Sequence, residues 1–173
     1  LKIKKFLKKK GYIICPVDDY LIKLENVNYK WLQKIKPGII IDVGASNGGF
    51  AKKIRKILPQ AQMFCFEPLQ QSYNSLIENF NDDKFFEAFN IAVSNMRGES
   101  DFYECISSGS SSILEMAEVH KKAYPKTTNN NKIIVKVDTL DNLLLKKLWT
   151  NEGRILLKID VQGAEELVLQ GAE

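Results

Sequence analysis

The sequence predicts an α/β fold in which a mostly parallel sheet carries helices on both faces. Short apolar runs rich in β-branched residues alternate with segments whose apolar residues recur every three or four positions. Strands of that kind are typical of parallel sheets, and their alternation with helices is typical of βαβ units. A chain of 173 residues, 45% hydrophobic and 27% charged, is long enough for one such domain. We expect a helical segment over residues 1–36 and the α/β domain over residues 37–173.

The N-terminal part is expected to be helical and to lead into the first strand. Asp18 or Asp19 supplies a helix N-cap, and apolar residues at helical spacing continue to about Lys34. Pro37-Gly38 then indicates a turn, and the apolar run that ends at Asp42 indicates a buried strand. The later elements are expected as helix 50–58, strand 64–66, helix 69–80, strand 89–94, strand 100–105, strand 132–137, helix 141–148 and strand 155–160.

The turn after the first strand has the composition of a nucleoside-binding loop. Gly44, Gly48 and Gly49 allow the backbone to turn sharply and to approach a ligand closely. Glu67 ends the next buried strand, 19 positions after Gly48. An acid at about 20 residues is the group that binds ribose hydroxyls in βαβ nucleotide sites. The two segments together therefore predict a nucleoside-cofactor pocket.

Two other ligand classes fit this turn less well. The dinucleotide pattern G-x-G-x-x-G requires a glycine where this chain has Ser46, and no Gly-Lys-Ser/Thr follows that would make a P-loop. The turn is instead preceded by Asp42, and a carboxylate at that place suits a cationic ligand better than a phosphate. S-adenosylmethionine, with its ammonium and sulfonium charges, is such a ligand.

The sequence resembles the FkbM-type S-adenosylmethionine-dependent methyltransferases, a branch of the Rossmann-like methyltransferases. The resemblance spans roughly Lys36 to Glu173 and rests on short motifs that occur in the family's order. These motifs are Lys36-Pro37-Gly38, Ile41-Asp42-Val43-Gly44-Ala45, Phe66-Glu67-Pro68, Ile91-Ala92-Val93-Ser94, Ser110-Ser111-Ser112-Ile113, Val137-Asp138-Thr139-Leu140-Asp141 and Leu157-Lys158-Ile159-Asp160-Val161-Gln162-Gly163-Ala164-Glu165.

The resemblance implies a Rossmann-like methyltransferase sandwich that transfers a methyl group, usually to a hydroxyl oxygen of a sugar, glycan or natural product. In an open α/β sheet, ligands bind at the carboxyl ends of the strands, so the acids at these ends should converge on one crevice. The residues expected to bind S-adenosylmethionine are Asp42, Gly44, Ala45, Asn47, Gly48, Glu67, Pro68, Ala92 and Asp160.

Methyl transfer to a hydroxyl benefits from a base that removes the proton. The candidates, in decreasing preference, are Asp160, Glu165, Lys158 and His120. The alternative role for Asp160 is to orient the cofactor. Lys158 lies two residues earlier in the same strand and shares a face with Asp160, so it would lower the pKa of that carboxyl or attract an acidic substrate.

Several partners and activities are not expected. Six lysines in Leu1–Lys10 account for more than the whole net charge of +4, so the rest of the chain has no excess of the basic residues that a nucleic-acid reader needs. The lysine run is interpreted as a solvated terminus, with contact to an anionic membrane or partner as the alternative.

The sequence contains no cluster of acidic residues that would predict a metal site. Three scattered cysteines and the lack of a long apolar run favour a cytoplasmic location. The alternative functions are a noncatalytic binding module and, less favoured, an NAD-dependent oxidoreductase.

Two further expectations concern the parts that depart from a regular α/β pattern. Residues 107–131 form an insert, with a short helix over Ile113–Tyr124 that carries His120, and this insert is either a lid over the acceptor or an ordinary variable loop. The domain is expected to be incomplete at its C-terminal side. The apolar strand near Ile155 would then have an unpaired edge unless further strands complete the sheet.

Overall fold

The structure is a computed structural model, and it describes residues 29, 31–105, 111–114, 130–148 and 153–172. Most of the expected N-terminal helix, Leu1–Lys10 and His120 lie outside these residues. The only helix described before the sheet is the short α3 (Leu32–Ile35), which ends at Lys36 in a left-handed conformation. No helix among the described residues is long and apolar enough to cross a membrane.

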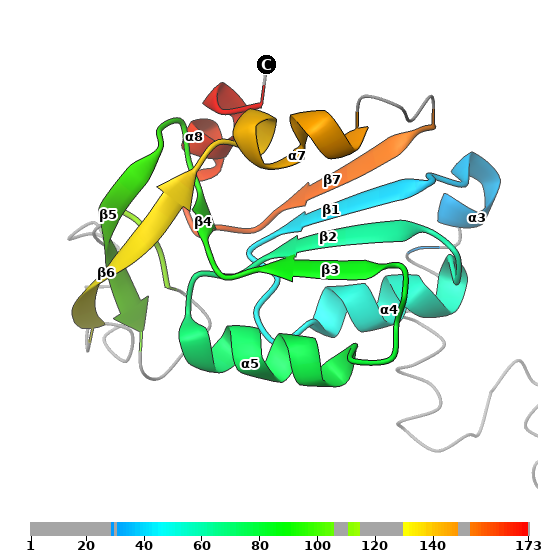
Figure 1. Cartoon of the computed structure of the whole chain (residues 1–173), viewed down its shortest axis with the longest axis horizontal. Helices are drawn as coiled ribbons and strands as arrows, with labels where there is room; N and C mark the ends of the chain where they lie inside the picture. The colour runs from blue at the N-terminus through cyan, green and yellow to red at the C-terminus, as the bar shows by residue number, and fades with distance from the viewer. Residues whose placement is uncertain (1–28, 30, 106–110, 115–129, 149–152, 173) are drawn as a thin grey trace, which may run out of the picture.

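The main sheet has four parallel strands, and the first strand lies inside it. β1 (Ile39–Val43) pairs with β2 (Gln62–Phe66) on one side and with β7 (Ile155–Ile159) on the other. β3 (Phe86–Phe89) pairs with β2, which gives the order β3-β2-β1-β7 (Figure 1). The register aligns the last residues of β1, β2 and β7, so these three strands end at one edge of the sheet. Among the described strands, β7 pairs with β1 alone.

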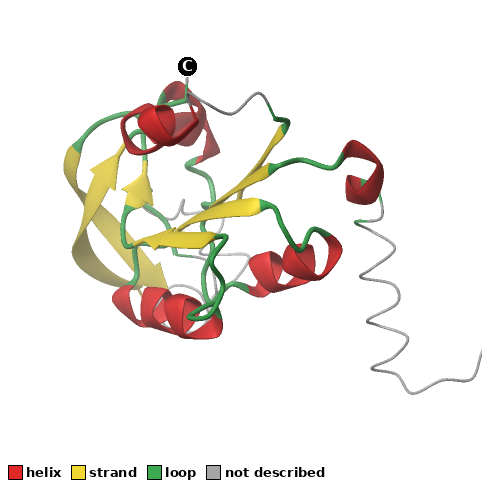
Figure 2. Ribbon diagram, turned by 45° about the vertical axis from the view of Figure 1, so that its right-hand side comes forward, coloured by secondary structure: helices red, strands yellow, loops and turns green. Residues whose placement is uncertain are grey.

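Helices cover both faces of this sheet, as the sequence predicted. α4 (Gly49–Ile57) and α5 (Gln70–Asn79) lie on one face, and α7 (Leu140–Leu148) and α8 (Glu165–Gln170) lie toward the other (Figures 1 and 2). The two faces are separate apolar cores because successive strand residues point in opposite directions. The first core contains Ile40, Ile54, Met63, Cys65 and Leu76. The second contains Ile39, Ile41, Val43, Phe64, Phe66, Leu144 and Val168.

A second, smaller sheet stands beside the carboxyl ends of the main strands. β5 (Gly98–Cys105) and β6 (Asn130–Asp138) form an antiparallel pair, and β4 (Ala92–Val93) joins β6 in parallel. Figure 1 shows this sheet at the end of the main sheet where β1, β2 and β3 finish. The strands predicted at residues 100–105 and 132–137 therefore both belong to this second sheet.

The single strand expected at residues 89–94 is wrong, because the two sheets divide this segment between them. The parallel pairing ends at Phe89, and Ala92–Val93 pairs with β6 in the second sheet. Asn90 lies between the two, and its side-chain amide donates hydrogen bonds to the carbonyl oxygens of Glu67 and Pro68 at 3.0 and 2.9 Å. Apolar composition alone did not reveal this break, because Phe89 and Val93, on either side of Asn90, both contact the same apolar core.

Candidate functional site

The glycine loop after β1 packs against the end of β7. Gly44 has φ of +77°, and a side chain there would overlap the backbone carbonyl of Asp160. The backbone amides of Gly44 and Ala45 both donate to the carbonyl oxygen of Phe66 at 3.0 Å, and the amide of Asp160 donates to the carbonyl oxygen of Val43 at the same distance. Glycine is required at position 44 because only glycine adopts this φ without strain while allowing such close approach. The loop is thereby attached to both neighbouring strands.

The second glycine of the loop begins helix α4. Gly48 has φ of +85°, and a Cβ at this position would lie 2.8 Å from atoms of Leu76 and Phe80 on the α5 side. The loop between the two glycines also contains Ser46 with φ of +50°, a conformation that is uncommon outside glycine. A specific hydrogen bond holds Ser46 in this conformation, and its acceptor is the acid at the end of β2.

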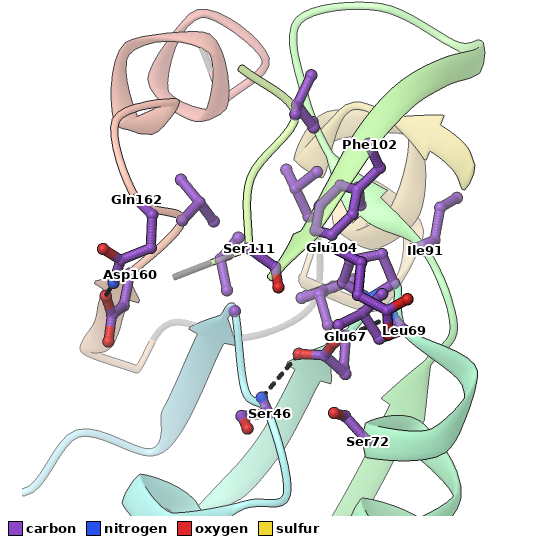
Figure 3. A pocket seen from close by; sticks show the side chains of 18 of the residues that line it. Ser46, Glu67, Leu69, Ser72, Ile91, Phe102, Glu104, Ser111, Asp160 and Gln162 are labelled. Carbon is purple, nitrogen blue, oxygen red and sulfur yellow. Dashed lines mark hydrogen bonds between the residues drawn. The ribbon is translucent and has the colours of Figure 1, made fainter. Parts of the chain in front are cut away.

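Glu67 connects the glycine loop to the start of α5. Its Oε2 accepts a hydrogen bond from the backbone amide of Ser46 at 2.8 Å, and its Oε1 accepts one from the amide of Leu69 at 3.0 Å (Figure 3). The side chain is buried, and burial raises the pKa of the carboxyl, although the two amide hydrogen bonds act in the opposite direction. Each carboxylate oxygen can accept more than one hydrogen bond, so Glu67 keeps lone pairs for a ligand.

A pocket of about 530 Å³ lies between the carboxyl edge of the main sheet and the second sheet. Its size is within the range of small-molecule sites, roughly 300–1,000 Å³. One wall comes from the loops after β1, β2 and β7, and the facing wall comes from β5 and the residues that follow it (Figure 3). The lining residues are Val43, Gly44, Ser46, Phe66, Glu67, Pro68, Leu69, Gln71, Ser72, Ile91, Ala92, Val93, Phe102, Glu104, Cys105, Ser111, Ile113, Asn131, Asp160, Val161 and Gln162.

The pocket is acidic. Glu67, Glu104 and Asp160 are its ionisable carboxyl groups, and the described residues that line it include no lysine, arginine or histidine. Carboxylates that share a concave, partly apolar site create a negative potential that favours cations and disfavours phosphates. The described residues contain no cluster of three or more metal-ligating side chains, so the charge has no metal site to explain it there.

Lys158 is close to the pocket but points beneath the glycine loop. Its Nζ lies 2.9 Å from Oδ1 of Asp42 and donates a hydrogen bond to the carbonyl oxygen of Gly44 at 2.9 Å. Oδ2 of Asp160 lies farther from it, at 3.6 Å, and the ammonium is also 5.7 Å from the ring centroid of Phe50. The ammonium of Lys158 therefore connects β1, the glycine loop and β7, and it does not line the pocket.

Asp42 is almost completely buried and does not line the pocket. Burial raises its pKa to about 6, and the attraction of Lys158 only partly offsets that rise. Within the described residues, neither carboxylate oxygen of Asp42 has a partner with hydrogen-bond geometry, so its contact with Lys158 is an ion pair. Asp42 thus lies beneath the glycine loop, and the carboxyl groups that line the pocket are those of other residues.

The other two candidate bases differ in their surroundings. Asp160 lines the pocket, its side chain is 57% exposed, and its Oδ1 accepts a hydrogen bond from the side-chain amide of Gln162 at 2.9 Å. Glu165 lies at the first turn of α8, outside the residues that line the pocket, and accepts a hydrogen bond from the amide of Gly163. Backbone hydrogen bonds lower the pKa of Glu165. Of the two, Asp160 is the better placed to meet a ligand.

The structure brings together some of the predicted site residues and separates others. Five line the pocket: Gly44, Glu67, Pro68, Ala92 and Asp160. Six lie outside its lining: Asp42, Ala45, Asn47, Gly48, Lys158 and Glu165. Most of the predicted lid, with His120, is outside the described residues, but Ser111 and Ile113 line the pocket. Sequence reasoning missed Phe102 and Glu104 as pocket residues. The signal was that they are two positions apart on the expected strand at 100–105, so their side chains share one face.

The chain is similar to known methyltransferases. The family model of the methyltransferase FkbM domain matches residues 42–173. The chain is 28% identical over 152 residues to the 2-O-methyltransferase NoeI of Sinorhizobium fredii, covering 82% of this chain and 60% of that relative's length. It is also similar to the crystal structure of methyltransferase FkbM from Methylobacillus flagellatus, with 13% identity and a TM-score of 0.48 over 79% of this chain and 29% of that one. The chain therefore belongs to the methyltransferase FkbM domain family.

Proposed function

We propose that the protein is an S-adenosylmethionine-dependent methyltransferase that methylates a hydroxyl oxygen of a sugar, glycan or natural product. The observation that carries the choice of cofactor is the charge of the pocket. Its described lining contains three carboxyl groups and no basic side chain. S-adenosylmethionine carries an ammonium, a sulfonium and one carboxylate, so it is a net cation, whereas NAD carries a pyrophosphate. The pocket attracts the first and repels the second.

The residues on the loop edge suit a nucleoside with a positively charged tail. Glu67 is held by the amides of Ser46 and Leu69, and its remaining lone pairs face a pocket where ribose hydroxyls would find an acceptor. Gly44 allows close approach of the ligand to the backbone. Asp160, at the other end of the same edge, supplies a carboxylate for the ammonium or for the acceptor's proton.

The mechanism requires little covalent chemistry from the protein. Bound S-adenosylmethionine would supply a methyl group that is already activated by the sulfonium. The chain's own residues then have to hold the acceptor oxygen in line with the methyl, exclude water and accept one proton. The apolar lining by Phe66, Val93 and Phe102 excludes water, and Asp160 is the first candidate for the proton.

The nature of the acceptor rests on similarity. The relative NoeI is named a 2-O-methyltransferase, which supports an oxygen acceptor here. This chain spans 60% of that relative's length, so the acceptor of the whole protein is part of the proposal. Sugar hydroxyls are the first choice because the family resemblance points to them.

Calorimetric titration of S-adenosylmethionine and of NAD into the full-length protein tests the cofactor. We expect S-adenosylmethionine to bind near micromolar, about −8 kcal/mol, and NAD not to bind detectably. Glu67→Gln should weaken binding, because it replaces an acceptor-only carboxylate by an amide and disturbs the Ser46 contact. Glu78→Gln, on the exposed surface of α5, is the matched control and should bind as wild type does. Preference for NAD would reverse the proposal.

Turnover separates an enzyme from a noncatalytic module. The protein should transfer the labelled methyl of S-adenosylmethionine to members of a panel of methyl glycosides. The new O-methyl ether should resist base and should also survive the acid that cleaves the glycosidic bond. Binding of S-adenosylmethionine without transfer to glycosides, phenols or polyols would favour the binding module. Asp160→Asn should lower turnover much more than affinity if Asp160 accepts the proton.

A further inference from the structure

Glu104 is the one pocket carboxyl group without a defined partner among the described residues. Glu67 accepts hydrogen bonds from two backbone amides, and Asp160 accepts one from Gln162. The half-buried carboxylate of Glu104 makes no hydrogen bond or ion pair with any described residue, although it lines the pocket. Because it lines the pocket, its lone pairs are available to a ligand group that donates a hydrogen bond.

The position of Glu104 indicates which part of a ligand it meets. It is on β5, opposite Asn131 of β6, and thus belongs to the second sheet rather than to the strand ends that carry the family motifs. In Figure 3, Phe102 and Glu104 extend from β5 toward the end of the pocket where Glu67 and Leu69 lie. Asp160 and Gln162 lie at the other end of the view.

The surroundings of Glu104 suit a flat heteroaromatic ring better than a sugar. Leu69, Ile91 and Phe102 line the same end of the pocket, and Figure 3 shows them near Glu104. Large apolar side chains with one polar acceptor at the edge are typical of sites for flat, mostly apolar ligand groups. Glu67, on the facing wall, would accept hydrogen bonds from the ribose hydroxyls of the cofactor, so the base attached to that ribose would lie near Glu104.

We infer that Glu104 accepts a hydrogen bond from the exocyclic amino group of the adenine and thereby selects the base of the cofactor. This inference rests on the proposed use of S-adenosylmethionine. The amino group is a donor only, so an acceptor-only carboxylate is its natural partner, and the 6-oxo group of hypoxanthine would meet the same carboxylate as an unfavourable acceptor. Glu104 is therefore a specificity-determining residue at the nucleoside end of the pocket, separate from the proton acceptor of the reaction.

The test compares two compounds that differ only at the N1–C6 edge of the base, where hypoxanthine has a 6-oxo group and an N1–H in place of the 6-amino group and the bare N1 of adenine. Affinities of the full-length protein for S-adenosylhomocysteine and S-inosylhomocysteine are measured by calorimetry, for the wild type and for Glu104→Gln. The wild type should bind the adenosine compound roughly ten- to a hundred-fold more tightly, the range of a charge-assisted hydrogen bond. In Glu104→Gln this ratio should fall to within about three-fold, since an amide can donate to the 6-oxo group as well as accept from the amino group.

Controls keep this inference distinguishable from the proposed function. Glu99→Gln, exposed on the same strand, should preserve the wild-type ratio. Thermal unfolding of each variant shows that it is folded. Glu104→Asp, which has a shorter side chain with the same carboxylate, should keep part of the preference for the adenosine compound.

An unchanged affinity ratio in a folded Glu104→Gln overturns the inference while S-adenosylmethionine binding stands. A change confined to the affinity for S-(2′-deoxyadenosyl)homocysteine would place Glu104 at the ribose and also overturn it. If no S-adenosyl compound binds the wild type, the proposed function itself fails.

Discussion

Lys158 and Asp42 are register partners on adjacent strands, and their side chains form an ion pair beneath the glycine loop. Nζ of Lys158 lies 2.9 Å from Oδ1 of Asp42, and the carboxyl is 1% exposed. The same ammonium donates to the carbonyl of Gly44, so one cation connects β7, β1 and the loop that borders the pocket. The sequence motifs that contain these residues therefore have a structural role as well as any role toward a ligand.

Removal of Lys158 should destabilise the fold. Lys158→Met leaves the buried Asp42 carboxylate without its counterion, and loss of one partner of a buried pair costs about 3 kcal/mol or more. Urea unfolding measures this as a lower free energy of unfolding. Lys136→Met, an exposed lysine on β6, is the control and should change it by less than about 0.5 kcal/mol.

The double variant shows whether the loss comes from the unpaired charge. Asp42→Asn combined with Lys158→Met removes both charges, so it should recover much of the stability that Lys158→Met loses. Additive losses in the double-mutant cycle would mean that the two side chains do not interact in solution.

The titration of Asp42 should appear in the pH dependence of stability. The carboxyl has an ordinary pKa of 3.8 when unfolded and about 6 when folded, mainly because it is buried. Since the folded pKa is the higher one, the protonated carboxyl favours folding. Its contribution is fully present below about pH 4 and is lost as the pH rises through about 6.

Comparison with Asp42→Asn isolates this effect. From about pH 4 to pH 7, the free energy of unfolding of the wild type should fall by about 3 kcal/mol relative to the variant, which corresponds to about two pKa units. The measurement is urea unfolding of both proteins at several pH values. A difference that stays constant over this range would show that the folded protein does not raise the pKa of Asp42.

Gly44 should not tolerate a side chain. Gly44→Ala places a methyl group at φ of +77° and against the carbonyl of Asp160, so the loop must move. The left-handed conformation alone costs about 1–2 kcal/mol, and the overlap adds to that. We expect lower stability and weaker S-adenosylmethionine binding, measured by thermal unfolding and calorimetry.

Gly38→Ala is the matched control for this substitution. Gly38 lies just before the same strand, and no atom lies within 4 Å of the place that an alanine methyl group would take, so alanine should be neutral there. Equal effects of the two substitutions would contradict the close packing of the loop on Asp160.

Arg55 should be irreplaceable by lysine. Its guanidinium contacts Asp83 at 2.6 Å and donates to the carbonyl oxygens of Leu58, Pro59, Ala61 and Phe85, which links the end of α4 to β2 and β3. A lysine side chain has a single ammonium group, so it cannot donate to all of these acceptors at once as the planar guanidinium does. Arg55→Lys should lower the free energy of unfolding by about 2 kcal/mol, whereas Lys56→Gln on the exposed side of α4 should change it little. Urea unfolding of both variants checks this, and equal stabilities would contradict the role of the guanidinium.

Local sequence patterns predicted much of the fold. The strands at β1, β2 and β7, the helices between them and the presence of helices on both faces follow from apolar periodicity and from the turn residues. Periodicity did not predict that the chain leaves the main sheet at Asn90. A buried apolar segment looks the same whichever sheet it joins, and only the amide of Asn90, bonded to the carbonyls after β2, separates the two.

The sequence by itself determined that a glycine loop and an acid stand at the ends of neighbouring strands, because glycine freedom and strand periodicity are local properties. The tertiary structure decided which acidic side chains line the pocket. Asp42 lies under the loop with Lys158, because strand register brings those two together, whereas Glu104 enters the pocket from the second sheet. Register and sheet packing join residues far apart in the chain, and local patterns carry no record of such contacts.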